Sequence, residues 1–136
     1  MKRKTTWLDL HSEIVGVFQK LKDAPERSKP KALVAAFDAD GTLWPHDLGE
    51  SFFKFQIQNN LLPNLPNNPW EFYRAWKTSG NPRPAYTWLA QINAGVDLKT
   101  VRSWAQAAYG QLPKPKYFEE QKMLIESLHD LGVQVF

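Results

Sequence analysis

The segment ALVAAFDADGTLWPHD, residues 32–47, is apolar at its start and becomes polar and acidic from residue 38 onward. It opens with a short, continuously apolar run from Ala32 to Phe37, which two aspartates, Asp38 and Asp40, follow directly. A run of this length predicts a strand buried on both faces, as in a parallel sheet flanked by helices. Like charges gathered directly after a buried strand indicate a site that holds a cation or carries chemistry.

The two aspartates stand where the ligands of an open parallel sheet bind, at the carboxyl end of a strand. Residues two apart on an extended backbone point the same way, so the carboxylates of Asp38 and Asp40 can face one pocket. Two carboxylates this close resist joint ionisation, and a hard cation such as Mg²⁺ relieves the repulsion. We therefore expect Asp38 and Asp40 to bind Mg²⁺.

This pair of acids suits phosphoryl transfer. One ionised carboxylate can attack phosphorus and form an aspartyl-phosphate, while the other protonates the leaving oxygen and later activates water. Gly41 permits a tight turn after the acids, and Thr42 offers a hydroxyl and an amide to the phosphoryl oxygens. Gly41 and Thr42 are thus expected to bind the substrate.

The remaining periodicity predicts helices before and after the first strand, and then a second strand-like run, VQVF, at residues 133–136. Thr6 and Asp97 are expected to cap two of the helices, and Gly95, Gly110 and Gly132 to end three. Parallel pairing of the two strands is expected, because a helical crossover separates them. The expected helices span residues 6–22, 48–59, 70–77, 85–93, 98–109 and 117–131.

The motif FDADGTLW, residues 37–44, resembles the first motif of the haloacid dehalogenase-like (HAD) hydrolase superfamily. The resemblance implies Asp38 as nucleophile, Asp40 as general acid and base, and Mg²⁺ held by the Asp38 carboxylate and the Asp40 carbonyl. An acid at the second position implies the phosphatase branch, acting on a small phosphorylated metabolite.

The resemblance also implies an α/β fold. A partial Rossmann-like HAD core is expected over residues 1–46 and 113–136, with an inserted α-helical cap over 47–112. This insertion resembles the cap of phosphoserine phosphatase-like members, in which an acidic residue near Asp47 or Glu50 helps to select the substrate.

Three later motifs of the superfamily do not follow in this chain: a Ser or Thr after the second strand, a Lys or Arg, and an acidic pair. The segment LIESLHDLGVQVF, residues 124–136, resembles the helix and strand that lead to the Ser or Thr. The expectation is therefore a member truncated before the second motif. The alternative function is a catalytically incomplete fragment or a non-enzymatic interaction protein.

Simpler explanations compete at several positions. The acids could form only a polar turn, and Asp47 and Glu50 could serve only the positive end of a helix dipole. His46 could touch substrate or be solvated, and Arg74 and Arg83 could bind an anion or be surface charges. A calcium loop of the EF-hand type is excluded, because its glycine and its final glutamate are missing. Five aromatic residues fall at helical spacing, which favours packing between helices: Trp70, Tyr73, Trp76, Trp88 and Trp104.

Composition narrows the class of protein. The chain has 136 residues, a net charge of +3 and no cysteine, so a nucleic-acid surface is not expected and a cytoplasmic location is. The basic start at residues 2–4 is not followed by the apolar run of an export signal, and no run is long enough for a membrane span. Two strands are marginal alone, so self-association through an incomplete sheet edge is possible.

Overall fold

The computed structural model describes residues 6–136, and the chain divides into two compact units. Of the described residues, 6–45 and 114–136 form the strand unit, and 46–113 form the helical unit. The basic residues 2–4, considered above as the start of an export signal, lie outside the described residues.

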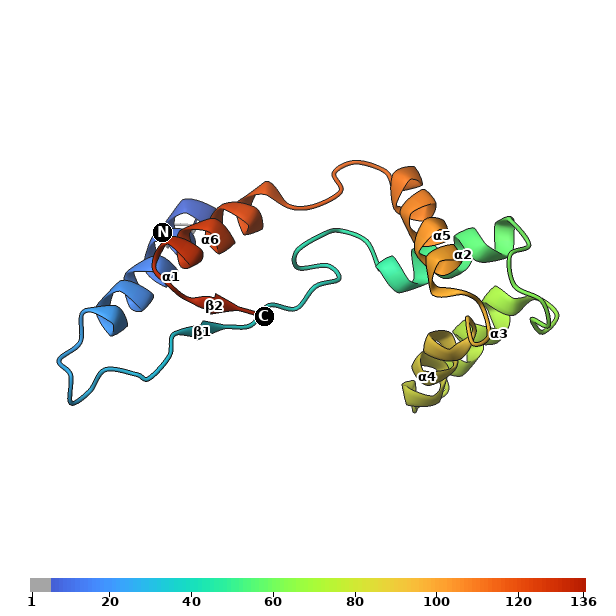
Figure 1. Cartoon of the computed structure of the whole chain (residues 1–136), viewed down its shortest axis with the longest axis horizontal. Coiled ribbons are helices and arrows are strands. Elements are labelled where there is room, and N and C mark those ends of the chain that lie inside the picture. The colour runs from blue at the N-terminus through green and yellow to red at the C-terminus, as the bar shows by residue number, and fades with distance from the viewer. Residues whose placement is uncertain (1–5) are drawn as a thin grey trace, which may run out of the picture. The chain divides into compact units, whose positions relative to one another are not determined.

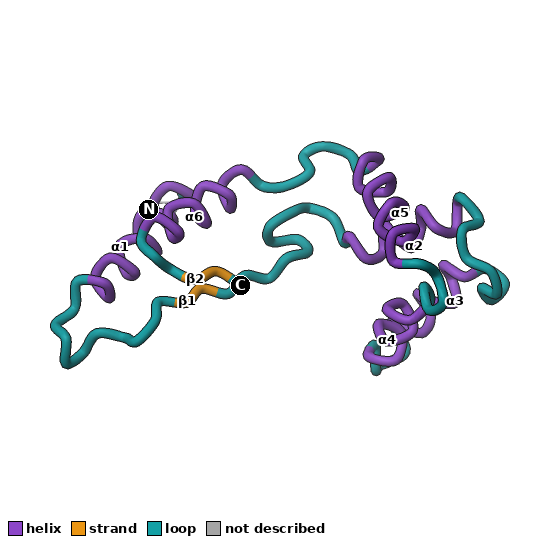
Figure 2. The backbone as a smooth tube through the Cα atoms, in the orientation of Figure 1, coloured by secondary structure: helices purple, strands orange, loops and turns teal. Residues whose placement is uncertain are grey.

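The described residues form six helices and two short strands (Figures 1 and 2). The protein is therefore a mixed, mostly helical fold with a parallel sheet of two strands, and the larger Rossmann-like core remains a prediction. In chain order the elements are α1 (Trp7–Lys22), β1 (Val34–Ala35), α2 (Leu48–Gln58), α3 (Pro69–Lys77), α4 (Arg83–Gln91), α5 (Leu98–Gln111), α6 (Glu119–Asp130) and β2 (Gln134–Val135).

Side-chain caps explain where several helices begin. Thr6 and Asp9 form a reciprocal capping box at the start of α1, as the sequence predicts. The hydrogen bond from the Thr6 amide holds the pKa of Asp9 below its ordinary value. Asp47 and Asp97 cap α2 and α5 by accepting from backbone amides three residues on.

The expected end of α5 at Gly110 is wrong, because the helix continues to Gln111. Gly110 is not among the glycines with a positive φ, whereas Gly95 and Gly132 have φ of 84° and 80° after their helices. The last helical residue is Gln111, and its C-cap Leu112 is extended with ψ 139° and precedes Pro113. A residue before proline is pushed out of the helical region, and this restriction sets the end of α5.

The two strands pair in parallel, which confirms the prediction for the sheet. Val34 lies opposite Gln134, and the hydrogen bonds of the ladder continue beyond the strands themselves. The Phe136 amide donates to the Ala35 carbonyl at 2.9 Å, and the Phe37 amide donates to the Phe136 carbonyl at 2.8 Å. Phe37 is therefore the last residue of the first segment that the ladder fixes.

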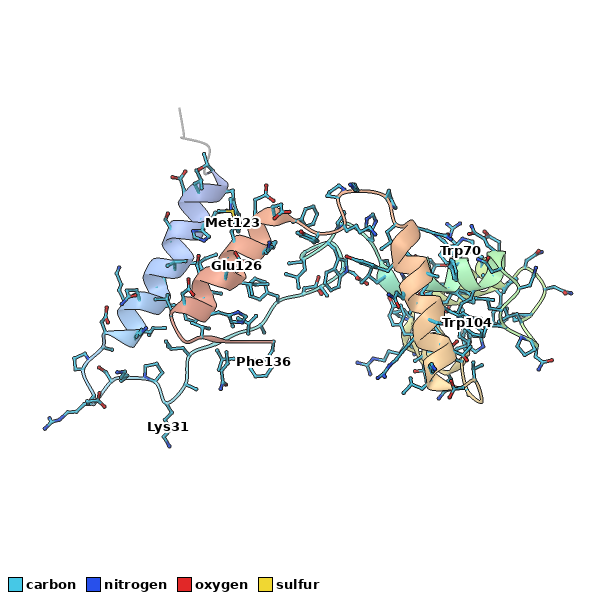
Figure 3. The ribbon with its side chains drawn as sticks, turned by 45° about the horizontal axis from the view of Figure 1, so that its top comes forward. Lys31, Trp70, Trp104, Met123, Glu126 and Phe136 are labelled. Atoms are coloured by element: carbon cyan, nitrogen blue, oxygen red, sulfur yellow. The ribbon has the colours of Figure 1, made fainter. Side chains whose placement is uncertain are left out.

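The expected burial of the first strand on both faces is wrong. Burial alternates along residues 33–40, so Leu33, Ala35 and Phe37 pack into the core while Val34 is 50% exposed. Only one face is covered, by α1 and α6, and Phe136 projects from the opposite side, 74% exposed (Figure 3). The continuous apolar run hid this alternation, since small alanines occupy both faces.

The helical unit has its own core of aromatic side chains. Phe53 and Tyr73 are fully buried, and their rings meet edge to face with centroids 5.8 Å apart. The predicted packing of the aromatic residues between helices is confirmed for Trp70, Trp76 and Trp88, which surround this pair. Trp104 on α5 is half-buried outside this cluster.

Within residues 6–136, no helix combines the length and the apolar character that crossing a membrane requires.

We predict that Leu128→Ala destabilises the strand unit by about 2–5 kcal/mol, because Leu128 is 1% exposed at the centre of its core. The measurement is urea unfolding followed by circular dichroism. Met123→Ala on the same helix is the control, since Met123 is 50% exposed and its loss should shift the unfolding midpoint little. Equal shifts for the two variants would contradict the assigned core.

Candidate functional site

The acidic loop, defined as residues 38–44, begins directly after the last ladder residue of the first strand. Asp38 follows Phe37, whose amide is the last to bond across the ladder. Both Asp38 and Asp40 are exposed while Ala39 between them is half-buried, so the alternation of the strand carries on into the loop. The structure thus places both carboxylates on the accessible side of the chain at the carboxyl end of the strand.

Backbone hydrogen bonds hold the acidic loop in one turn. The Ala39 carbonyl accepts from the amides of Thr42 and Leu43, at 3.1 and 2.8 Å. The Gly41 amide donates to the Trp44 carbonyl at 2.7 Å. Gly41 has φ 81°, a left-handed conformation that a side chain would strain, which explains a glycine directly after the two acids.

Two side chains of the acidic loop each donate a hydrogen bond to a different one of the two carboxylates. The Thr42 hydroxyl donates to Asp38 Oδ2 at 3.1 Å, and the Trp44 indole N–H donates to Asp40 Oδ1 at 2.5 Å. Thr42 therefore lies beside Asp38, although its amide is already bonded within the turn. The sequence analysis missed Trp44, although its position four residues after Asp40 is the signal that could have indicated the contact.

The donor set of the acidic loop fits Mg²⁺ in its chemistry. Two accessible carboxylates offer hard oxygen ligands, and protein-bound Mg²⁺ commonly uses one or two carboxylates and keeps several waters or phosphate oxygens. Across residues 6–136, no group of three or more His, Cys, Asp or Glu side chains is arranged to hold a metal. Within the acidic loop, Asp38 and Asp40 are the residues that could hold the ion.

Asp47 and Glu50, the predicted selectors of substrate, belong to a charged cluster in the helical unit. The Lys77 ammonium donates to Glu50 Oε1 and lies 3.7 Å from Asp47 Oδ2. The Tyr73 hydroxyl also donates to Glu50, at 3.3 Å. These contacts join the start of α2 to the end of α3, so both acids have a structural role. The contact of Lys77 with Asp47 and Glu50 could not be predicted from the sequence, because only the packing of the helices brings these residues together.

The other polar candidates also make local contacts within the helical unit. His46 donates from Nε2 to the Pro113 carbonyl at 3.0 Å, which ties the two ends of this unit together. Arg74 pairs with Glu71 at 3.7 Å on the exposed side of α3. Arg83 is exposed at the first turn of α4.

Burial, charge and hydrogen bonding shift the pKa values of two groups in this cluster, Tyr73 and Lys77. Burial raises the pKa of Tyr73 to about 12, and the neighbouring carboxylates add to the shift. The hydrogen bond to Glu50 raises the pKa of Lys77 above its ordinary value, against the opposing effect of burial. Both groups therefore hold their protons more tightly in the folded protein than in the unfolded chain.

No protein-family model matches the chain, and no curated protein or solved structure is significantly similar to it.

We predict that the helical unit loses stability as the pH rises from about 10 to about 12. The unfolded tyrosine ionises near its ordinary pKa, whereas folded Tyr73 stays protonated to about 12, so its contribution is complete below 10 and is lost above. The raised pKa of Lys77 acts in the same direction. Urea unfolding at several pH values measures the loss.

Tyr73→Phe should flatten this pH dependence, because the ring stays while the ionisable hydroxyl goes. Tyr117→Phe is the control, since Tyr117 is exposed and belongs to the strand unit. A decline as steep in Tyr73→Phe as in the unchanged protein would contradict the assignment.

Proposed function

We propose that the protein is a Mg²⁺-dependent phosphomonoester hydrolase that acts through an aspartyl-phosphate on Asp38. The observation that carries the proposal is the position of Asp38, exposed and directly after the last residue of the strand ladder, with the Thr42 hydroxyl 3.1 Å away. The resemblance of residues 37–44 to the first HAD motif supports the same assignment.

Two displacements at phosphorus make up the reaction. A carboxylate oxygen of Asp38 attacks phosphorus, and the bond to the ester oxygen breaks with its electron pair on the leaving oxygen, which takes the Asp40 proton. Water then attacks the phosphoryl group and gives a proton to Asp40. The bond between phosphorus and Asp38 breaks, which releases inorganic phosphate and restores the Asp38 carboxylate.

Bound Mg²⁺ supplies positive charge that offsets the repulsion between the carboxylates and the phosphate oxygens. The chain's own residues position the groups that react. Thr42 fixes the Asp38 carboxylate and can turn its hydroxyl to a phosphoryl oxygen, while Trp44 fixes the Asp40 carboxylate through its indole N–H. The hydrogen bond of Phe37 to Phe136 fixes the residue that directly precedes the acidic loop.

The substrate class in this proposal is a small phosphorylated metabolite, and the location is the cytoplasm. Asp47 and Glu50, both in the helical unit, are proposed to help select the substrate. Lys77 offsets part of their negative charge.

We predict that the chain hydrolyses p-nitrophenyl phosphate in Mg²⁺ and that Asp38→Asn lowers kcat by about 10³-fold or more, because the nucleophile is lost. Chelation of the metal with EDTA should abolish turnover. Release of p-nitrophenolate measures both effects.

Asp130→Asn is the matched control, because it makes the same chemical change at an exposed position at the end of α6. Circular dichroism confirms that each variant is folded. A folded wild-type chain without Mg²⁺-dependent turnover, or undiminished turnover in Asp38→Asn, would refute the proposal.

A second candidate function, as an interaction protein that associates with itself through the sheet, has its own observation. Residues 33, 35 and 37 bond toward β2, so the backbone groups of Val34 and Ala36 point to the outer edge of β1. The exposed face beside that edge carries Val34 and Phe136. An apolar edge of this kind is a template for pairing with another strand.

If this second function is correct, the sedimentation coefficient should rise with protein concentration, and Val34→Lys should keep the chain monomeric because a charge blocks the edge. Val17→Lys on α1 is the control, since Val17 and Val34 are 51% and 50% exposed. A wild-type chain that stays monomeric at every concentration would exclude this function.

A further inference from the structure

We infer that a groove between the acidic loop and α6 binds an apolar, flat leaving group of the phosphate ester, with Trp44 as the residue that determines specificity. The inference rests on the proposed function and names the class of substrate. The groove has a volume of about 550 Å³ and lies wholly within the strand unit, as do the two catalytic aspartates.

One wall of the groove is the acidic loop and the other is a second face of α6. Leu43 and Trp44 form the first wall, and Phe118 and Ile125 contribute apolar side chains to the second. Ile125 differs from Leu124 and Leu128, which the same helix buries in the core, so α6 presents one side to the core and another to the groove, with Phe118 directly before its first turn. Phe118 and Ile125 are half-buried, as are Leu43 and Trp44.

The walls are fixed before any ligand binds. The Phe118 amide donates to the Leu43 carbonyl at 2.9 Å, which joins the start of α6 to the acidic loop. On the loop side, the Trp44 carbonyl accepts from the Gly41 amide at 2.7 Å. A preformed groove saves the entropy of ordering its walls when a ligand enters.

Trp44 connects the groove to the reacting groups. Trp44 lines the groove, and its indole N–H donates to Asp40 Oδ1 at 2.5 Å. Asp40 protonates the leaving oxygen in the proposed reaction, so the organic part attached to that oxygen must lie near Trp44. An aromatic or otherwise flat apolar group would stack on the ring there.

The charges of the groove favour an uncharged leaving group. Lys122 and Glu126, on the groove side of α6, pair with each other at 3.9 Å and are both more than half exposed (Glu126 is labelled in Figure 3). Their charges offset each other at the solvent rim, while the interior of the groove is mainly apolar. A charged leaving group would lose water against these apolar walls, and the ionisable side chains of the groove, Lys122, Glu126 and His129, are all solvent-exposed.

The experiment compares 2-naphthylmethyl phosphate with ethyl phosphate, whose leaving groups are both aliphatic alkoxides of similar reactivity. We expect kcat/KM for the naphthylmethyl ester to exceed that for the ethyl ester by about 10-fold or more, as burial of an aromatic ring allows. Ile125→Ala, which removes apolar surface from the groove and leaves the Trp44–Asp40 hydrogen bond in place, should lower this ratio.

Two variants at position 44 separate stacking from positioning. Trp44→Phe keeps a ring and loses the indole N–H, so turnover of both esters should fall together and their ratio should persist. Trp44→Ala should lower the ratio itself. A ratio near one in the unchanged protein, or a ratio that Trp44→Ala and Ile125→Ala leave intact, would overturn the inference while the hydrolase function stands.

A binding measurement keeps the inference testable without turnover. The alcohol 2-naphthylmethanol, titrated into the full chain, should shift the Trp44 indole N–H resonance, and Trp44→Ala should weaken its binding by about 10-fold. Phe72→Ala, which removes an exposed aromatic ring of the helical unit, should leave binding unchanged. Binding without turnover would refute only the hydrolase proposal, whereas turnover without binding would refute only the groove.

Discussion

The hydrogen bond from the Phe37 amide to the Phe136 carbonyl is the constraint on which the candidate site depends. It closes a ladder between segments that lie far apart in the sequence, and closing so long a loop requires compensating contacts. The apolar core between the strands and the helices α1 and α6 supplies those contacts. Where this ladder stops, the acidic loop begins, so the pairing of two short strands determines where Asp38 lies.

The acidic loop is organised around its own backbone. Ala39 accepts two amides in one turn, and Gly41 provides the left-handed conformation that the turn needs. The two carboxylates are thereby given different neighbours, a hydroxyl for Asp38 and an indole N–H for Asp40. Different neighbours are what a nucleophile and a proton donor require if two like acids are to divide the work between them.

Local sequence signals predicted the parts of this protein that depend on neighbouring residues. The caps at Thr6 and Asp97 and the parallel pairing of the strands agree with the structure. The end of α5 did not, because the proline at position 113 outweighed the glycine at 110. The one-sided burial of the first strand was missed, since an unbroken apolar run cannot show which face a helix covers.

The candidate site also combines residues that local sequence patterns indicate with residues that only the fold brings together. Asp38, Asp40 and Gly41 could be identified from spacing, because strand alternation and the conformational freedom of glycine are local properties. Lys77 could not, because it meets Glu50 only when α2 and α3 pack. The groove beside Trp44 could not either, since only the fold brings Phe118 and Ile125 next to the acidic loop.

The central claim is that Asp38 accepts a phosphoryl group covalently. The most direct measurement is to incubate the chain with Mg²⁺ and acetyl phosphate, reduce it with sodium borohydride, and find the modified residue by peptide mass spectrometry. The account predicts that the acyl phosphate at position 38 is reduced to homoserine while Asp40 remains aspartate. A folded chain in which position 38 stays aspartate, or in which the reduction falls on another acid, would contradict it.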